Sequence, residues 1–176
     1  METSNYSSLS SSGRISSHPI LSQTENNATL WIGHLQNDTT DRFGGQTFKC
    51  PSDGFLDNIQ LFAETIPTPG DIRLTLHEFD NVSKRWGNAI AETTLNVQQD
   101  DREKWICFNL PPVQLKKEAS YGFRVFSYNA MIGLGEACHD RDHPFSFGHE
   151  WHGNSSDQTG NYFSYFSLTF KVEMRA

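Results

Sequence analysis

The side chains best suited to chemistry lie close together in the segment from Glu136 to Asn154. It holds four of the seven histidines, together with carboxylates and several aromatic residues. Aromatic rings stack on the apolar face of a pyranose, while imidazoles, amides and carboxylates hydrogen-bond its hydroxyls. We therefore expect a ligand-binding site, with carbohydrate or another neutral small molecule as the ligand. The residues predicted to form it are Trp151, Glu150, His149, His152, Asn154 and Glu136.

Three other aromatic residues could either extend this binding site or belong to the protein core. Trp105 points away from the apolar side of its own predicted strand, so it is included as a further candidate for a binding face. Phe145 and Phe147 lie within the 136–154 segment, but they could equally cover one end of the protein core. Because the segment is too aromatic for simple disorder, we expect a long loop that folds back over a sheet.

Metal binding is a second possible use of the same segment, because it offers imidazole and carboxylate ligands. The candidates are His139, Asp140, Asp142, His143, His149, Glu150 and His152. Their spacing matches no established zinc pattern, and on a strand His149 and Glu150 would face opposite ways. We therefore expect no transition-metal site and no cofactor. A structural Ca²⁺ remains possible, held by Asp140 and Asp142 or by Asn154 and Asp157.

Catalysis is the least favoured function. Glu136 and Glu150 could act as a glycosidase pair if their carboxyl groups lay about 5–9 Å apart. The chain has no Gly-x-Ser-x-Gly elbow and no phosphate-binding glycine loop. We therefore assign no catalytic residue. A hydrolase or isomerase using residues 136–152 is kept only as an alternative.

Short segments of alternating apolar and polar residues must position these side chains. One such segment is Ile72-Arg73-Leu74-Thr75-Leu76-His77, in which Arg73, Thr75 and His77 line the outward face. Pro and Gly turns separate the segments, as at Pro51–Gly54. This spacing predicts an all-β protein, an antiparallel sandwich of about nine or ten strands. Predicted strands cover 28–34, 45–50, 55–63, 72–79, 91–97, 104–110, 121–125, 131–136 and 163–175.

Several core-like stretches resemble a known family. They are Gln46-Thr47-Phe48, Leu56 to Leu61, and Val113 to Val125 with its Tyr121-Gly122-Phe123. Together they resemble bacterial jelly-roll β-sandwich modules of the carbohydrate-binding and galactose-binding-like type, over roughly 28–136. The resemblance implies a jelly-roll-like fold and an accessory, non-catalytic binding role. It transfers no ligand-binding residue, because the matching positions are core positions and the family's aromatic platforms lie in variable loops.

Composition and charge exclude some classes of binding partner and predict where the folded domain begins. The net charge of −7 argues against a nucleic-acid backbone or an anionic membrane as partner. We expect a disordered Ser-rich tail over 1–27 and a single β-sandwich domain over 28–176. The chain shows no signal peptide and no apolar run long enough to span a membrane. Its three cysteines, Cys50, Cys107 and Cys138, are expected to be free thiols, with one disulfide as the alternative.

The function predicted from the sequence is therefore a non-catalytic ligand-binding module for carbohydrate. The competing class is a structural or protein-interaction β-sandwich domain.

Overall fold

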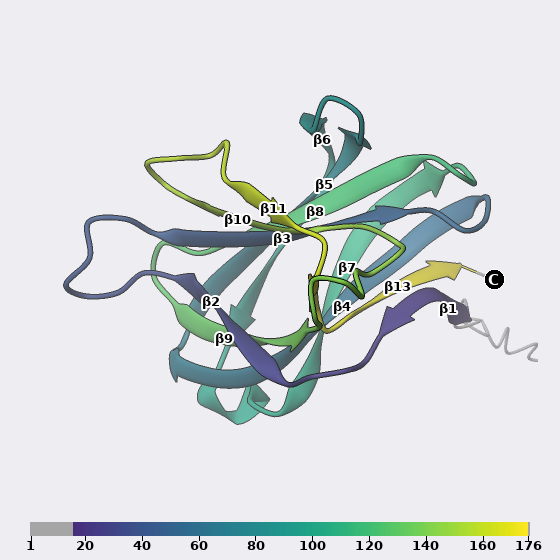
Figure 1. Cartoon of the computed structure of the whole chain (residues 1–176). Helices are drawn as coiled ribbons and strands as arrows, with labels where there is room; N and C mark the ends of the chain where they lie inside the picture. Colours follow the sequence, from purple (N-terminus) through teal and green to yellow (C-terminus); the bar gives the residue numbers. More distant parts are fainter. Residues whose placement is uncertain (1–15, 176) are drawn as a thin grey trace, which may run out of the picture.

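The computed structural model describes residues 16–175, which form antiparallel β-strands and one short 3-10 helix (Figure 1). The prediction of an all-β antiparallel fold is confirmed. The described residues hold thirteen strands, more than the nine or ten expected. In chain order the elements are β1 (Ser17–Gln23), β2 (Ala28–Gly33), β3 (Arg42–Lys49), β4 (Gly54–Thr68), β5 (Gly70–Asp80), β6 (Arg85–Val97), η1 (Gln99–Asp101), β7 (Lys104–Leu115), β8 (Ser120–Phe126), β9 (Met131–Cys138), β10 (Glu150–Asn154), β11 (Asn161–Phe163), β12 (Phe166–Leu168) and β13 (Phe170–Arg175).

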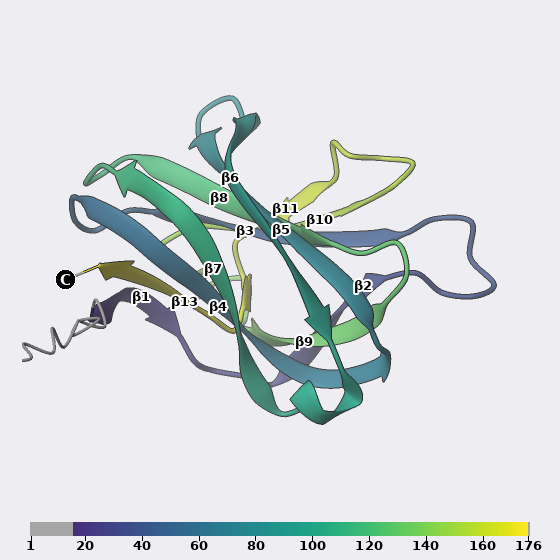
Figure 2. The ribbon, with the colours of Figure 1, turned by 180° about the vertical axis from the view of Figure 1, so that it is seen from behind.

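The strands pack as two facing layers. One layer contains β6, β5, β8, β3, β10 and β11 in that order. In the other layer, β13 and β7 flank the first part of the long strand β4, β1 pairs with β13, and β9 pairs with the end of β4. Strands β2 and β12 both pair with β9. Figures 1 and 2 show β3 and β10 lying over β9 and β2. The jelly-roll order of strands stays a prediction.

Apolar side chains on alternate strand positions fill the space between the layers. In β5, Ile72, Leu74 and Leu76 are fully buried, whereas Arg73 between them is exposed. Phe123 of β8 crosses to Phe170 of β13, with 5.7 Å between the ring centroids. The period-two pattern in the sequence therefore correctly indicates which face of these strands is buried.

The N-terminal boundary of the domain differs from the prediction. Residues 1–15 of the expected tail lie outside the described residues, but Ser17–Gln23 form β1 and pair antiparallel with β13 (Figure 2). Ile20 and Leu21 pack against the core, and Gln23 is buried. The prediction of disorder is therefore wrong for this segment. Its composition is too polar to indicate a strand, and it is held instead by main-chain hydrogen bonds to an edge that composition does not reveal.

The expected 136–154 loop is also shorter than predicted. Strand β9 continues to Cys138, and β10 begins at Glu150, so Glu136 and Glu150 lie on strands rather than in a loop. The connection between them folds back along β3, where Thr47 N–H donates to His149 O at 2.8 Å and Lys49 N–H to Phe147 O at 2.9 Å. Phe147 packs against the core, with its ring centroid 5.6 Å from that of Phe170.

Two smaller findings concern cysteines and membranes. Cys50, Cys107 and Cys138 are all free, and they are buried, partly exposed and exposed respectively. Within residues 16–175, no helix has the length and apolar character needed to cross a membrane.

Candidate functional site

Strand β10 sends the predicted site residues to two different faces of its layer. Glu150 pairs with Gln46 and His152 with Gly44, and a Cβ added at Gly44 would meet Leu30 and Ile32 of the core. Glu150 and His152 therefore point inward, between the layers. Trp151 lies between them in sequence and points to the outer face. The structure thus divides the predicted site into an inner cluster and an outer groove.

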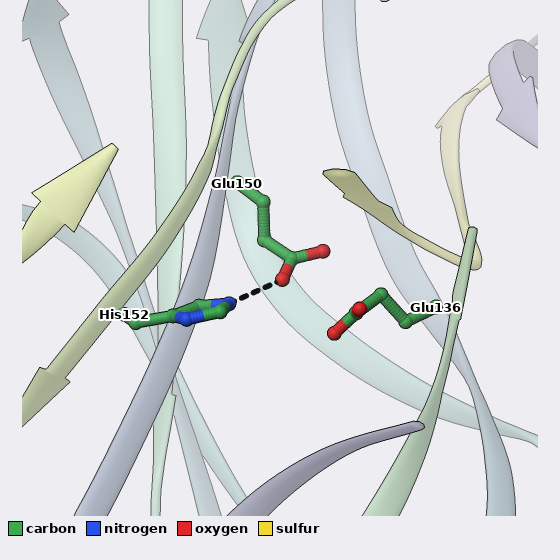
Figure 3. Close-up of side chains that lie close together, drawn as sticks. All are labelled: Glu136, Glu150 and His152. Carbon is green, nitrogen blue, oxygen red and sulfur yellow. Dashed lines mark hydrogen bonds and ion pairs between the residues drawn. The ribbon is translucent and has the colours of Figure 1, made fainter. Parts of the chain in front are cut away.

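The inner cluster consists of Glu136, Glu150 and His152. Glu136 belongs to the apolar face of β9, two residues after the buried Leu134, and pairs with Ala28 and Leu168. His152 Nε2 lies 2.5 Å from Glu150 Oε1. The ligand atoms of all three residues lie within 4.8 Å of one another. Figure 3 shows the Glu136 carboxyl group pointing toward that of Glu150, with the His152 ring beside them.

Burial governs the electrostatics of this cluster. The Glu150 side chain is fully buried and Glu136 is 5% exposed, whereas a third of the His152 side chain remains accessible. Loss of hydration raises the pKa of Glu136 and of Glu150 to about 8, and for Glu136 the charge of Glu150 adds to the rise. Burial also lowers the pKa of His152, although the charge of Glu136 opposes this. The short contact between His152 and Glu150 acts against these shifts, since an imidazolium would stabilise the neighbouring carboxylate. We therefore treat the three groups as one unit that shares its protons.

One oxygen of this unit lacks a fixed partner. Glu150 Oε2 is buried and has no hydrogen-bond donor among the described residues unless Glu136 holds a proton, whereas Oε1 contacts His152. A carboxylate oxygen without a donor is costly in a protein interior. The complete burial of Glu150 also argues against the glycosidase alternative, because a sugar could not reach that carboxyl group.

The outer groove is built from rows of side chains that cross four neighbouring strands. In the central row, Trp151 of β10, Gly45 of β3, Arg124 of β8 and Thr75 of β5 are successive pairing partners. Gly45 contributes no side chain, and a Cβ built there would lie 3.3 Å from the Trp151 ring. The absence of a side chain at Gly45 leaves room for the indole to lie across β3 toward Arg124.

Arg124 packs against two indole rings that also contact each other edge to face, with 5.7 Å between their ring centroids. Its guanidinium carbon is 4.4 Å from the ring centre of Trp86 and 4.6 Å from that of Trp151. Within residues 16–175, no carboxylate forms an ion pair with Arg124, and its buried Nε has no hydrogen-bond partner. The cation is thus held by aromatic faces and keeps hydrogen-bond donors free.

Aromatic and polar side chains surround Arg124. The groove has a volume of about 220 Å³. Its walls are formed by Phe43, Arg73, Thr75, His77, Ala89, Glu92, Phe126, Tyr128, Trp151 and Gln158. Tyr128 is 62% exposed at the rim, with its ring 6.2 Å from Phe43 and 5.7 Å from Phe126.

Sequence reasoning missed most of this groove. The sequence places Arg73, Thr75 and His77 on the outward face of one strand, but it does not indicate that this row lines a groove. Arg124 is the polar residue between Phe123 and Val125 on a predicted strand, so alternation puts it on the outer face, but no motif marks it as a site residue. Which rows meet across β3, β8 and β5 depends on register, which the sequence does not display.

The remaining predicted residues lie outside both sites or play structural roles. Trp151 is 1% exposed, and its Nε1 donates to Thr159 O at 3.0 Å, so it is no open stacking platform. His149 contacts the end of β3 through its main chain, and its buried Nδ1 is unpartnered within the described residues. Trp105 packs on Phe62 and Lys171. It belongs to β7, which pairs with β4 in the other layer and with none of the groove strands.

The oxygens suggested for Ca²⁺ at the β10–β11 turn accept hydrogen bonds from the main chain. Asn154 Oδ1 accepts from Ser156 N–H at 2.8 Å and Asp157 N–H at 2.7 Å. Asp157 Oδ1 accepts from Thr159 N–H at 3.0 Å and Gly160 N–H at 3.3 Å. Asn154 therefore organises the turn rather than the groove. Asp140 and Asp142 are exposed in the 139–149 connection.

Comparison with known proteins adds no family. No protein-family model and no curated protein matches this chain. The functional argument therefore depends on the two sites themselves.

Proposed function

We propose that this protein is a non-catalytic carbohydrate-binding module and that the outer groove holds the sugar. The observation that carries the proposal is Arg124, a cation without an ion-pair partner among residues 16–175 that packs against Trp86 and Trp151 and lines a groove with aromatic walls. Guanidinium donors can bind adjacent hydroxyls, or the carboxylate of an acidic sugar, in a fixed geometry. Tyr128 supplies an exposed ring at the rim for stacking.

The size and composition of the groove support a small ligand. Its volume of about 220 Å³ is below the roughly 300–1,000 Å³ usual for drug-sized ligands, which favours one monosaccharide unit. A larger hollow of about 490 Å³ lies beside Phe79, Arg85 and Lys116. Like the groove, it has charges of both signs, but none of its lining cations packs against two indole rings as Arg124 does, so it supports a ligand site less well.

The test is a glycan array followed by calorimetry with the best ligand. Arg124→Lys keeps the charge but loses the planar donor fork, and Tyr128→Ala removes the rim ring. We expect Arg124→Lys to weaken binding about ten-fold or more, because a hydrogen bond from a charged group is worth roughly 1.5–3 kcal/mol. Trp105→Ala, a partly exposed tryptophan in the other layer, is the matched control and should bind normally.

Two outcomes would count against the proposal. Binding that survives both Arg124→Lys and Tyr128→Ala would place the ligand elsewhere. No binding across neutral and acidic glycans, together with self-association in solution, would favour the structural or protein-interaction class.

A further inference from the structure

We propose that Glu136, Glu150 and His152 bind one divalent transition-metal ion between the two layers. This site is separate from the sugar groove, because its side chains project from the opposite face of β10. Two carboxylates and one imidazole form a ligand set used for first-row divalent metals, whereas Ca²⁺ prefers oxygen ligands alone. We therefore expect Zn²⁺ or Co²⁺ to bind and Ca²⁺ to bind poorly.

The unpartnered oxygen of Glu150 is the observation that points to a ligand. The side chain is fully buried, and while Glu136 is ionised Oε2 has no donor among the described residues. Burying two carboxylates side by side is unfavourable unless something positive lies between them. A divalent cation would neutralise both carboxylates and satisfy this oxygen in one step.

The arrangement of strands gives the site a rigid frame and an access path. Glu150 and His152 are two residues apart on β10, and Glu136 comes from the facing strand β9 (Figure 3). A bound ion would therefore connect the two layers. His152 is the accessible member, with Phe163 at 4.6 Å and Phe166 at 6.3 Å between ring centroids. Three protein ligands would leave a coordination position for water on this side.

The expectation of no metal site compared His149 with Glu150, which strand alternation sends to opposite faces. The same alternation places Glu150 and His152 on one face, and the third ligand is supplied by Glu136 from another strand. A ligand from a distant strand cannot be recognised from the spacing of residues along a short segment.

The full chain is stripped of metal with EDTA, loaded with Zn²⁺ and dialysed, and its metal content and thermal stability are then measured. We expect one equivalent of Zn²⁺ to be retained at pH 7.5 and the melting temperature to rise by roughly 5 °C or more at saturating Zn²⁺. His152→Ala and Glu136→Gln should abolish both effects. Glu150→Gln should do the same, and since the amide imitates a neutral carboxyl group, it is expected to fold.

Two controls distinguish this site from other metal-binding groups. His139→Ala alters another His–Glu pair, since His139 Nε2 lies 2.6 Å from Glu25 Oε2, and it should keep the full response to Zn²⁺. Cys138 is an exposed thiol, so the measurement is repeated in Cys138→Ser and with Co²⁺. The near-ultraviolet absorption of the Co²⁺ protein should contain no thiolate-to-metal charge-transfer band.

Specific results would overturn the proposal. One is no retained metal and no change in melting temperature with Zn²⁺ or Co²⁺. Another is a response that persists in both His152→Ala and Glu136→Gln. A response lost in Cys138→Ser would assign the metal to the thiol. If Glu150→Gln fails to fold, the partly accessible His152 still decides the outcome through His152→Ala.

Discussion

Neighbouring residues in this protein have different roles because β10 alternates between two environments. Glu150 and His152 enter the space between the layers, whereas Trp151 lies on the outer face against Arg124. The three residues from Glu150 to His152 therefore contribute to two sites. Polar residues of the groove also contact one another. His77 Nε2 lies 2.8 Å from Thr75 Oγ1, and Thr75 is the pairing partner of Arg124.

His77 predicts a dependence of stability on pH. The Gly87 carbonyl only accepts hydrogen bonds, so His77 Nδ1, 2.9 Å away, carries the proton, and Nε2 accepts from Thr75. Burial lowers the pKa of His77, and the positive charge of Arg124 lowers it further, while the Gly87 carbonyl opposes both. Below about pH 6.5 the unfolded chain therefore binds a proton that the folded protein resists. Stability should fall as the pH decreases from 7 to 5.

The measurement is urea unfolding at several pH values in EDTA. His77→Gln should show a shallower loss of stability between pH 7 and pH 5 than the unmodified protein. His18→Gln, at an exposed position on β1, serves as the control and should leave the slope unchanged. An identical slope in His77→Gln would show that this imidazole does not contribute.

At the scale of elements, β1 shows how a polar segment becomes part of a sheet. It covers the edge of β13, and its last residue, Gln23, is only 6% exposed. The Gln23 amide donates to Glu25 O at 3.0 Å and to Leu168 O at 3.2 Å, and its oxygen accepts from Glu25 N–H at 2.6 Å. Strand β1 is thus attached at this end to the β12–β13 region by one side chain.

Replacing Gln23 should loosen β1 without unfolding the domain. Gln23→Ala leaves buried main-chain groups with fewer partners, which is expected to cost about 1–3 kcal/mol. Amide exchange should become faster along β1 and at its partners in β13, while β5 and β8 keep their protection. Ser22→Ala, at the exposed neighbouring position, should change neither. Equal loss of protection in β5 and β8 would show that β1 is not a separable unit.

At the scale of the whole molecule, a single core holds the two layers together and fixes both sites. Phe123 is fully buried in β8, next to Arg124 of the groove, and its ring packs on Phe170 of the opposite layer. Between β9 and β10, the polar side chains of the inner cluster occupy a place in the interior of the sandwich. The positions of both sites therefore depend on the same packing between the layers.

Removing the Phe123 ring should destabilise the entire domain. Phe123→Ala would leave a cavity and is expected to lower the free energy of unfolding by about 3–5 kcal/mol. Phe55→Ala, whose ring is 50% exposed, should lower it by less than about 1 kcal/mol. Denaturant unfolding measures both variants. A small effect of Phe123→Ala would mean that the layers do not depend on this contact.

The sequence by itself determined the class of fold and the inward or outward direction of many side chains. Alternation in Ile72 to His77 and around Phe123 identified the buried faces correctly, because a strand has a fixed period of two. It also identified Glu136, Glu150 and His152 as chemically interesting residues. It erred for β1, where the attachment is a property of the neighbouring strand β13 rather than of the segment's own composition.

Only the tertiary structure decided which residues meet. Glu136 reaches Glu150 because β9 and β10 face each other across the core, and Arg124 meets Trp151 because both pair with Gly45 of β3. Such contacts depend on strand order and register, which are set by packing over the whole chain rather than by local periodicity. The two proposed sites are therefore products of the fold, although each of their side chains is visible in the sequence.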